Sequence, residues 1–132
     1  MSGVITMEKP VVVAVDDSRE MLDILKSVIA GAGYRFFGAG NAAQCMRLVR
    51  DVEPALILLD VQMPETDGFE LCRQLRAVEA FRTVPIAFVT ARRTAQDVKA
   101  GIAAGGNDFI TKPFDAKSLM QRVDRWVNLK QV

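Results

Sequence analysis

The sequence predicts one α/β domain, a three-layer α/β/α sandwich with a five-stranded parallel sheet in the middle. Two observations lead to this prediction. Near-continuous apolar runs alternate five times with amphipathic segments along the 132 residues, and such runs are typical of parallel strands buried on both faces. Half of the residues are hydrophobic, which is enough for a single core, and no repeat or internal linker divides the chain.

The five predicted strands are short apolar runs that end at polar or turn-forming residues. The first, VVVAV, follows Pro10 and ends at Asp16-Asp17, and the third, ALILL, ends at Asp60. The fourth, PIAFV, closes on Thr90. We expect the strands at residues 11–15, 34–39, 55–59, 85–89 and 108–111. Right-handed crossovers between them would place helices on both faces of the sheet.

Each predicted helix carries apolar residues at intervals of three or four positions, which is the spacing of one helix face. The first helix begins after Ser18 and stops at Gly31 and Gly33, and Asn41 is expected to cap the second. The remaining helices are expected after Asp67-Gly68, near residues 94–104 and from about residue 115 to 127.

The fourth predicted helix has a thin apolar stripe that consists of Ala95, Val98 and Ile102. A helix held by so few large side chains is typical of an element that can shift when a nearby site changes. An alanine-rich surface helix would show the same pattern.

The charges are nearly balanced, with 17 Lys and Arg against 16 Asp and Glu, unlike the basic footprint of a nucleic-acid binder. No apolar run approaches the roughly 20 residues that cross a bilayer. The opening MSGVITMEKP lacks the basic and apolar regions of a secretory signal. Residues 1–9 are therefore expected to be a flexible leader, or a cloning remnant, before a domain at 10–132, and these features favour the cytoplasm.

The two cysteines, Cys45 and Cys72, fall on the apolar sides of predicted helices, so we expect buried thiols rather than a disulfide or a metal pair. The chain contains no histidine. Serine–histidine and cysteine–histidine nucleophile systems and histidine metal sites are therefore excluded.

Polar residues follow the strands at one edge of the predicted sheet. Asp16 and Asp17 end the first strand, Asp60 the third, Thr90 the fourth and Lys112 the fifth. In a parallel sheet these ends share one edge, where ligands bind. Two carboxylates about 5 Å apart repel by roughly 3 kcal/mol at an effective dielectric constant of 20. Three carboxylates against one lysine therefore indicate raised pKa values or a divalent cation, and hard oxygen ligands favour Mg²⁺.

A carboxylate beside Mg²⁺, opposite a lysine and a hydroxyl, can accept a phosphoryl group and form an acyl phosphate. Taken singly, each residue has a structural explanation. Asp16-Asp17 could cap the first helix, Thr90 could simply end a strand and Lys112-Pro113 could form a turn. Their occurrence together, in this order at the strand ends of one sheet, favours a functional site in which Asp60 is phosphorylated.

Four motifs in order resemble the receiver domain of two-component response regulators, the family of the stand-alone chemotaxis receiver. They are VVAVDDS at 12–18, LILLDVQMPETDGFEL at 56–71, PIAFVTA at 85–91 and GGNDFITKPF at 105–114. The resemblance covers roughly residues 10–127. It implies a flavodoxin-like fold with strand order 2-1-3-4-5.

The resemblance also implies a role for each site residue. Asp60 would be the phosphoacceptor and would ligate Mg²⁺, with Mn²⁺ as an alternative, together with Asp17 and the Gln62 backbone carbonyl. Asp16 would act largely through a water molecule. Lys112 would pair with the phosphoryl group or, in its absence, with Asp60.

Two further positions match the switch of this family. Thr90 would turn its hydroxyl toward a phosphoryl oxygen, and Phe109 would swing inward as Thr90 moves. The Lys112–Pro113 peptide is expected to be cis. The face that changes would comprise the fourth helix, the fifth strand and the fifth helix.

Several residues depart from the family pattern. Phe109 lacks the hydroxyl of the tyrosine that is often found there, and Gly106 replaces a more common alanine, which is expected to loosen the turn. Arg92 and Gln62 occupy positions that modulate the lifetime of the acyl phosphate. Asp108 and Arg122 match a pair in the dimer face of transcription-factor receivers, but Ser118 stands where a partner glutamate is expected.

The resemblance implies partners as well. With no histidine of its own, the chain would receive its phosphoryl group from a histidine kinase, a histidine phosphotransfer protein or a small phosphodonor. Its output would be a downstream protein target or an output domain outside this chain, with no direct nucleic-acid or membrane binding by this domain. It would be a signalling phosphoacceptor rather than an enzyme, with slow self-dephosphorylation.

Three rival functions remain to be compared. A phosphatase of the haloacid-dehalogenase type needs Asp-x-Asp after its first strand, which VAVDDSRE lacks. A degenerate receiver would lack some of the polar residues, all of which are present here. A flavin carrier of the same fold needs a phosphate-binding loop after the first strand, and GxGxxG and GxxxxGK are absent there.

Overall fold

The computed structural model describes residues 9–129, so the predicted leader falls outside the described part of the chain except for Lys9. Five parallel strands form one sheet in the order β2-β1-β3-β4-β5, which confirms the predicted fold. The strands are β1 (Val11–Val15), β2 (Arg35–Ala39), β3 (Leu56–Leu59), β4 (Ile86–Thr90) and β5 (Asp108–Thr111).

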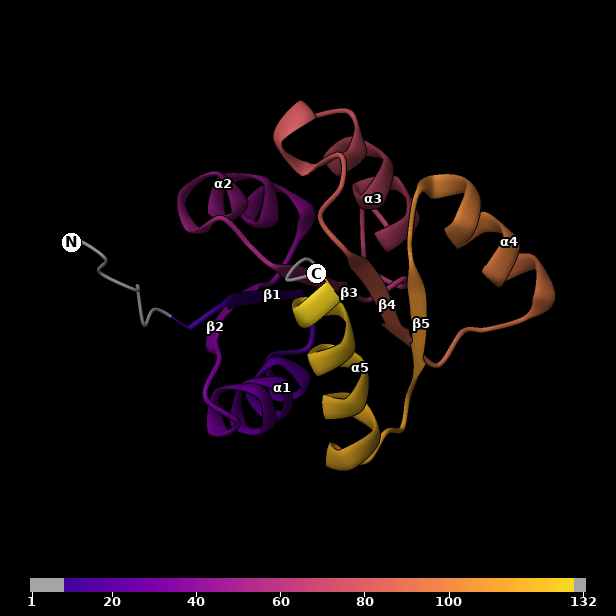
Figure 1. Ribbon diagram of the computed structural model, residues 1–132. Helices are drawn as coiled ribbons and strands as arrows, with labels where there is room; N and C mark the ends of the chain where they lie inside the picture. The colour runs from indigo at the N-terminus through magenta and orange to yellow at the C-terminus, as the bar shows by residue number, and fades with distance from the viewer. Residues whose placement is uncertain (1–8, 130–132) are drawn as a thin grey trace.

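Helices cover both faces of this sheet (Figure 1). They are α1 (Arg19–Gly31), α2 (Ala42–Val52), α3 (Gly68–Arg76), α4 (Ala95–Ala104) and α5 (Ala116–Asn128), with a 3₁₀ helix, η1 (Glu79–Phe81), that the sequence pattern did not predict. α1 and α5 cover one face, while α2, α3 and α4 cover the other. The predicted strands began one residue too early at Tyr34, Ala55 and Pro85.

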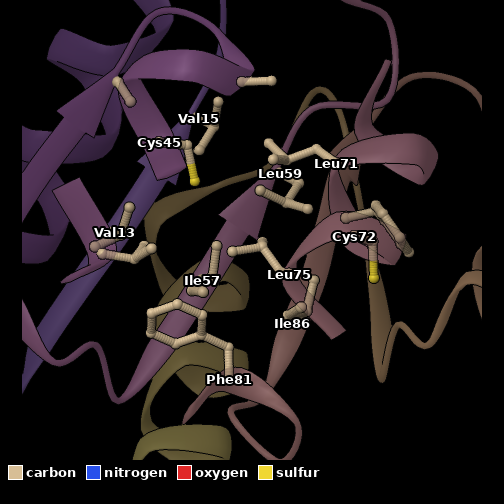
Figure 2. Packing of buried hydrophobic residues seen from close by; sticks show 14 of the residues in the cluster. Val13, Val15, Cys45, Ile57, Leu59, Leu71, Cys72, Leu75, Phe81 and Ile86 are labelled. Carbon is tan, nitrogen blue, oxygen red and sulfur yellow. The ribbon is translucent and has the colours of Figure 1, made fainter. Parts of the chain in front are cut away.

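The two cores follow the alternation of side chains along each strand. Val13 and Ile57 belong to the core under α2 and α3, whereas Val12 and Leu56 belong to the core under α1 and α5. Figure 2 shows the first of these cores, where strand residues such as Ile57 face Leu75 of α3. Every residue of β1, β3 and β4 is buried, which explains why their sequences are apolar throughout.

Both cysteine thiols are buried and unbridged, as expected. Cys45 packs from α2 and Cys72 from α3 into the same core (Figure 2). Burial raises the pKa of the Cys45 thiol to about 12 and also raises the pKa of Cys72. Neither thiol is therefore prepared to react as a thiolate.

The buried face of α4 differs from the prediction. Ile102 is 66% exposed, and the buried residues of this helix are Asp97, Gly101 and Ala104. The helix approaches the sheet closely because Gly101 has no side chain: a Cβ there would lie 2.5 Å from Cζ of Phe109. The predicted stripe was wrong because the aromatic ring that fills this contact comes from β5 rather than from α4.

Gly106 does not loosen the turn before β5, contrary to the expectation. A Cβ at this position would lie 2.2 Å from Cε2 of Phe88, and the Gly106 amide donates a hydrogen bond to the Gly101 carbonyl at 2.9 Å. The glycine therefore permits close packing of the turn on a large ring of β4.

Side chains cap the start of each long helix, which leaves the first acidic pair free for another role. The hydroxyl of Ser18 accepts from the Met21 amide and caps α1, and Asn41 caps α2 as predicted. Because Ser18 performs this function, Asp16 and Asp17 are not the N-cap of α1.

Candidate functional site

Three carboxylates converge at the carboxyl ends of β1 and β3. Oxygen atoms of Asp16, Asp17 and Asp60 all lie within 4.8 Å of one another. β1 and β3 are neighbours in the sheet, and the Asp60 amide donates to the Val15 carbonyl at 2.9 Å. The sheet backbone therefore places these side chains together although they are far apart in the sequence.

The three carboxylates differ in exposure. Asp16 and Asp60 are only 2% and 8% exposed, whereas Asp17 is exposed to solvent. Asp16 is held at both oxygens: Oδ1 accepts from the Ser18 amide at 2.9 Å, and Oδ2 accepts from Lys112 Nζ at 2.8 Å. An incoming ligand would therefore reach the cluster from the side of Asp17 and Asp60.

Lys112 arrives from the end of β5. Its amide donates to the Thr90 carbonyl at 3.0 Å, and the peptide that joins it to Pro113 is cis, as the resemblance implied. Its ammonium lies 2.8 Å from Asp16 Oδ2 but 3.6 Å from Asp60 Oδ1. The closer partner of the ammonium is thus Asp16 rather than Asp60.

The pKa of Asp60 is raised, first by burial and then by the neighbouring carboxylates. Burial raises this pKa above its ordinary value, and the charge of Asp16 raises it further; Lys112 and a hydrogen bond from the Gln62 backbone lower it, and Asp17 raises it again. The net direction is upward. One lysine does not compensate three carboxylates, and an all-oxygen donor set of this size fits Mg²⁺. The direction of the Gln62 carbonyl toward a cation stays a prediction.

Gly68 allows the site to form, and the sequence reasoning recognised it only as part of a helix start. A Cβ at Gly68 would lie 2.1 Å from the Asp60 carbonyl oxygen and 2.9 Å from Cα of Val61. The Gly68 amide donates to the Val61 carbonyl at 2.9 Å. The first turn of α3 is therefore packed directly against the backbone that carries Asp60.

Thr90 and Phe109 lie on the β4 and β5 side of the site. Thr90 is buried, and its hydroxyl accepts from the Arg92 amide at 3.0 Å. The ring of Phe109 is half-buried, with its centroid 5.1 Å from that of Phe88, and it packs on Gly101. The structure thus brings Thr90 to the rim of the site and places Phe109 under α4.

One buried carboxylate of α4 was not singled out from the sequence. Asp97, in the first turn of α4, is 5% exposed and forms a capping box with Thr94. It also accepts from Arg92 Nε at 2.7 Å. The signal that could have found it is Thr-x-x-Asp at 94–97, an acidic variant of the capping-box spacing just before an amphipathic run.

No helix within residues 9–129 is long and apolar enough to cross a membrane.

A comparison with known proteins places this architecture in a family. The model of the response regulator receiver domain matches residues 12–124. The DNA-binding response regulator MtrA of Mycobacterium tuberculosis is 37% identical over 118 residues, covering 89% of this chain and 50% of MtrA. MtrA of Mycobacterium leprae is 37% identical over 112 residues, covering 85% and 48%. The chain therefore spans about half the length of these curated relatives.

Solved structures agree with the family match. The chemotaxis protein CheY4 of Vibrio cholerae superposes with a TM-score of 0.86 at 26% identity, covering 89% of this chain and 98% of CheY4. The receiver domain of the sensor histidine kinase PA1611 from Pseudomonas aeruginosa PAO1, with a magnesium ion coordinated in its active site cleft, superposes at 0.83 with 28% identity, covering 91% and 98%. This chain belongs to the response regulator receiver domain family of two-component systems, whose general function is to accept a phosphoryl group.

Proposed function

We propose that Asp60 is the residue of this chain that accepts the phosphoryl group. The observation that supports this assignment is the convergence of Asp16, Asp17, Asp60 and Lys112 in one cluster, with three carboxylates against one lysine. Asp16 already accepts hydrogen bonds at both oxygens, and Asp17 is exposed. Asp60 is the carboxylate of the three that is both buried and less tightly paired with the lysine.

Mg²⁺ is the cation that the donor set fits best, with Mn²⁺ as an alternative. Asp17, Asp60 and the Gln62 backbone carbonyl would hold it, with Asp16 acting through a water molecule. When bound, Mg²⁺ would neutralise phosphoryl oxygens and lower the repulsion between donor and carboxylate. The magnesium ion in the PA1611 receiver domain supports this choice of ion.

In the transfer step, an Asp60 carboxylate oxygen attacks the phosphorus atom of the donor. A new O–P bond forms, and the bond from phosphorus to the donor's imidazole nitrogen, or to the acetate oxygen of acetyl phosphate, breaks. The electron pair of that bond leaves with the donor group, so no oxidant or reductant is needed. Lys112 would move from Asp16 toward the phosphoryl oxygens, and the Thr90 hydroxyl would donate to one of them.

Acetyl phosphate with Mg²⁺ tests the assignment. Intact mass spectrometry should detect one added phosphoryl group on the unaltered chain and none on Asp60→Asn, because the amide is not a nucleophile of this kind. Asp23→Asn, at an exposed position of α1, is the matched control and should be modified normally. Equal modification of the Asp60→Asn variant would reject the assignment.

Titration calorimetry with Mg²⁺ tests the metal ligands. Asp17→Asn should weaken Mg²⁺ binding by about tenfold, equivalent to about 1.4 kcal/mol, because an amide oxygen lacks the charge of a carboxylate. Asp23→Asn should bind Mg²⁺ like the unaltered chain. Full retention of affinity by Asp17→Asn would contradict its role as a ligand.

The phosphodonor would be a histidine kinase or a histidine phosphotransfer protein, and the responding face would comprise α4, β5 and α5 with Thr90 and Phe109 as the switch pair. In this proposal the chain acts in the cytoplasm and accepts a single phosphoryl group rather than turning over many substrates. A target protein or an output domain outside this chain would read the change. Sustained turnover of ordinary phosphomonoesters would contradict this proposal, and a pull-down with phosphorylated and unmodified chain would identify the partner.

A further inference from the structure

Asp97 is a buried carboxylate outside the three-carboxylate cluster, and hydrogen bonds occupy both of its oxygens. Oδ2 accepts from the Thr94 amide at 2.9 Å and from the Thr94 hydroxyl at 2.8 Å. Oδ1 accepts from Arg92 Nε at 2.7 Å. The side chain of Asp97 is 6% exposed. These bonds lower the pKa of Asp97, with the Thr94 amide as the largest cause, so the carboxylate stays charged at neutral pH.

The backbone of Arg92 contacts Thr90, at the end of the strand beside the proposed phosphorylation site. Its amide donates to the Thr90 hydroxyl at 3.0 Å, and Thr90 ends the strand next to β3, which leads into Asp60. Its guanidinium, however, is directed to Asp97 on α4, and its side chain is 48% exposed. The same residue thus contacts the site through its backbone and is held away from it through its side chain.

This arrangement has an electrostatic consequence. An arginine is always charged in proteins, and the neighbouring site has three carboxylates against one lysine. A guanidinium released at this rim would be attracted to the carboxylates and would compete with a divalent cation for them. Arg93, the next residue, is engaged elsewhere through a hydrogen bond to the Thr111 hydroxyl. Both arginines of the loop are therefore directed away from the carboxylates.

We infer that Asp97 is a positioning residue that holds the Arg92 guanidinium away from Asp16, Asp17 and Asp60 and so keeps the site open to a divalent cation. This inference rests on the proposed function. It also links α4 to the metal site, because a movement of the first turn of α4 would carry the carboxylate that restrains Arg92. A helix cap alone would explain the Thr94 bonds but not the ion pair with Arg92.

Asp97→Asn separates the two roles of the residue. The amide oxygen can still accept from Thr94, whereas the amide nitrogen is a donor and cannot bind the guanidinium. Titration calorimetry on the full chain should show that Asp97→Asn binds Mg²⁺ about fivefold more weakly, which corresponds to roughly 1 kcal/mol of binding free energy. The loss should shrink at high salt, because screening weakens the competition. The double variant Arg92→Gln/Asp97→Asn should recover the original affinity, while Arg93→Gln/Asp97→Asn should not.

The outcomes separate this inference from the proposed function. Failure of the unaltered chain to bind Mg²⁺ would overturn both. Normal Mg²⁺ binding by both the unaltered chain and Asp97→Asn would overturn the inference alone. Weaker binding that Arg92→Gln does not restore would also overturn it, because the loss would then come from a damaged helix cap. Weaker binding that Arg92→Gln restores supports it.

Discussion

The two edges of the sheet both gather polar side chains, but they are built in different ways. At the edge where β4 and β5 begin, one arginine, Arg76, donates to the carbonyls of Phe81, Val84 and Gly105 at 2.7 to 2.9 Å. It also donates to Asn107 Oδ1 at 2.9 Å. A single cation here joins α3 to the turns that precede two strands, and no second charge opposes it among these partners.

The opposite edge holds three carboxylates and one lysine. Hydrogen bonding does not distinguish the two edges, since no buried side-chain nitrogen or oxygen between residues 9 and 129 lacks a partner. The two edges differ in charge. At the Arg76 edge, the hydrogen bonds of the guanidinium are taken up by neutral carbonyl and amide oxygens. At the Asp60 edge, the three carboxylates outnumber the lysine, and a cation, alone or with a phosphoryl group, can neutralise the excess negative charge. One end of the sheet is thus stabilised by hydrogen bonds, while the other end stays able to bind a cation.

The largest change in stability should follow from removing Arg76. Arg76→Ala should lower the free energy of unfolding by about 3 kcal/mol, because several carbonyls and the Asn107 side chain lose their donor together. Urea unfolding measures the change. Arg73→Ala on the same helix is the control: its ion pair with Glu70 is half-exposed on both sides, so its loss should cost less than about 0.5 kcal/mol. Equal effects of the two variants would contradict the contrast between the edges.

A smaller change in stability should follow from a side chain at Gly68, which would separate α3 from the backbone of Asp60. Gly68→Ala would place a Cβ 2.1 Å from the Asp60 carbonyl, so α3 must move, at a cost of about 2 kcal/mol. Mg²⁺ binding should weaken in the same variant, because the loop that carries Asp60 shifts. Gly31→Ala is the control, with no atom within 4 Å of its added Cβ. A Gly68→Ala chain as stable as the control would show that α3 relaxes freely.

The smallest change should be a gain in stability, caused by removing the charge of Asp60. Asp60→Asn without Mg²⁺ should raise the free energy of unfolding at neutral pH by about 1 kcal/mol, because it removes a buried like charge at the site. The pKa of Asp60 is raised in the folded chain, so the folded chain binds the proton more tightly than the unfolded chain. The cost of the charge is full above the folded-state pKa and disappears as the pH falls below the ordinary value of 3.8.

Denaturant unfolding at several pH values checks this gain. The stability difference between Asp60→Asn and the unaltered chain should vanish in acid. Saturating Mg²⁺ should reduce or reverse it, because an ion that binds the folded chain stabilises that chain alone. A gain that is the same at every pH would show that the carboxylate charge is not its cause.

The regular part of the fold and the residues at the strand ends could be predicted from the sequence. Unbroken apolar runs marked β1, β3 and β4, and the polar residues that follow them, such as Asp16 and Asp60, were visible because they interrupt those runs. The strand order was implied by the resemblance and is observed. The buried face of α4 could not be predicted, because a stripe of Asp97, Gly101 and Ala104 carries almost no apolar signal.

The pattern of apolar runs and amphipathic segments by itself determined that this chain forms a parallel α/β sheet and that its acidic residues share one edge, because a helix between successive strands returns the chain to start the next strand in the same direction. Only the tertiary structure decided that Lys112 lies nearer to Asp16 than to Asp60, that Arg92 is held by Asp97 and that Arg76 joins the opposite edge. Such pairings depend on distances between groups far apart along the chain, and distances of a few ångströms decide which charge finds which partner.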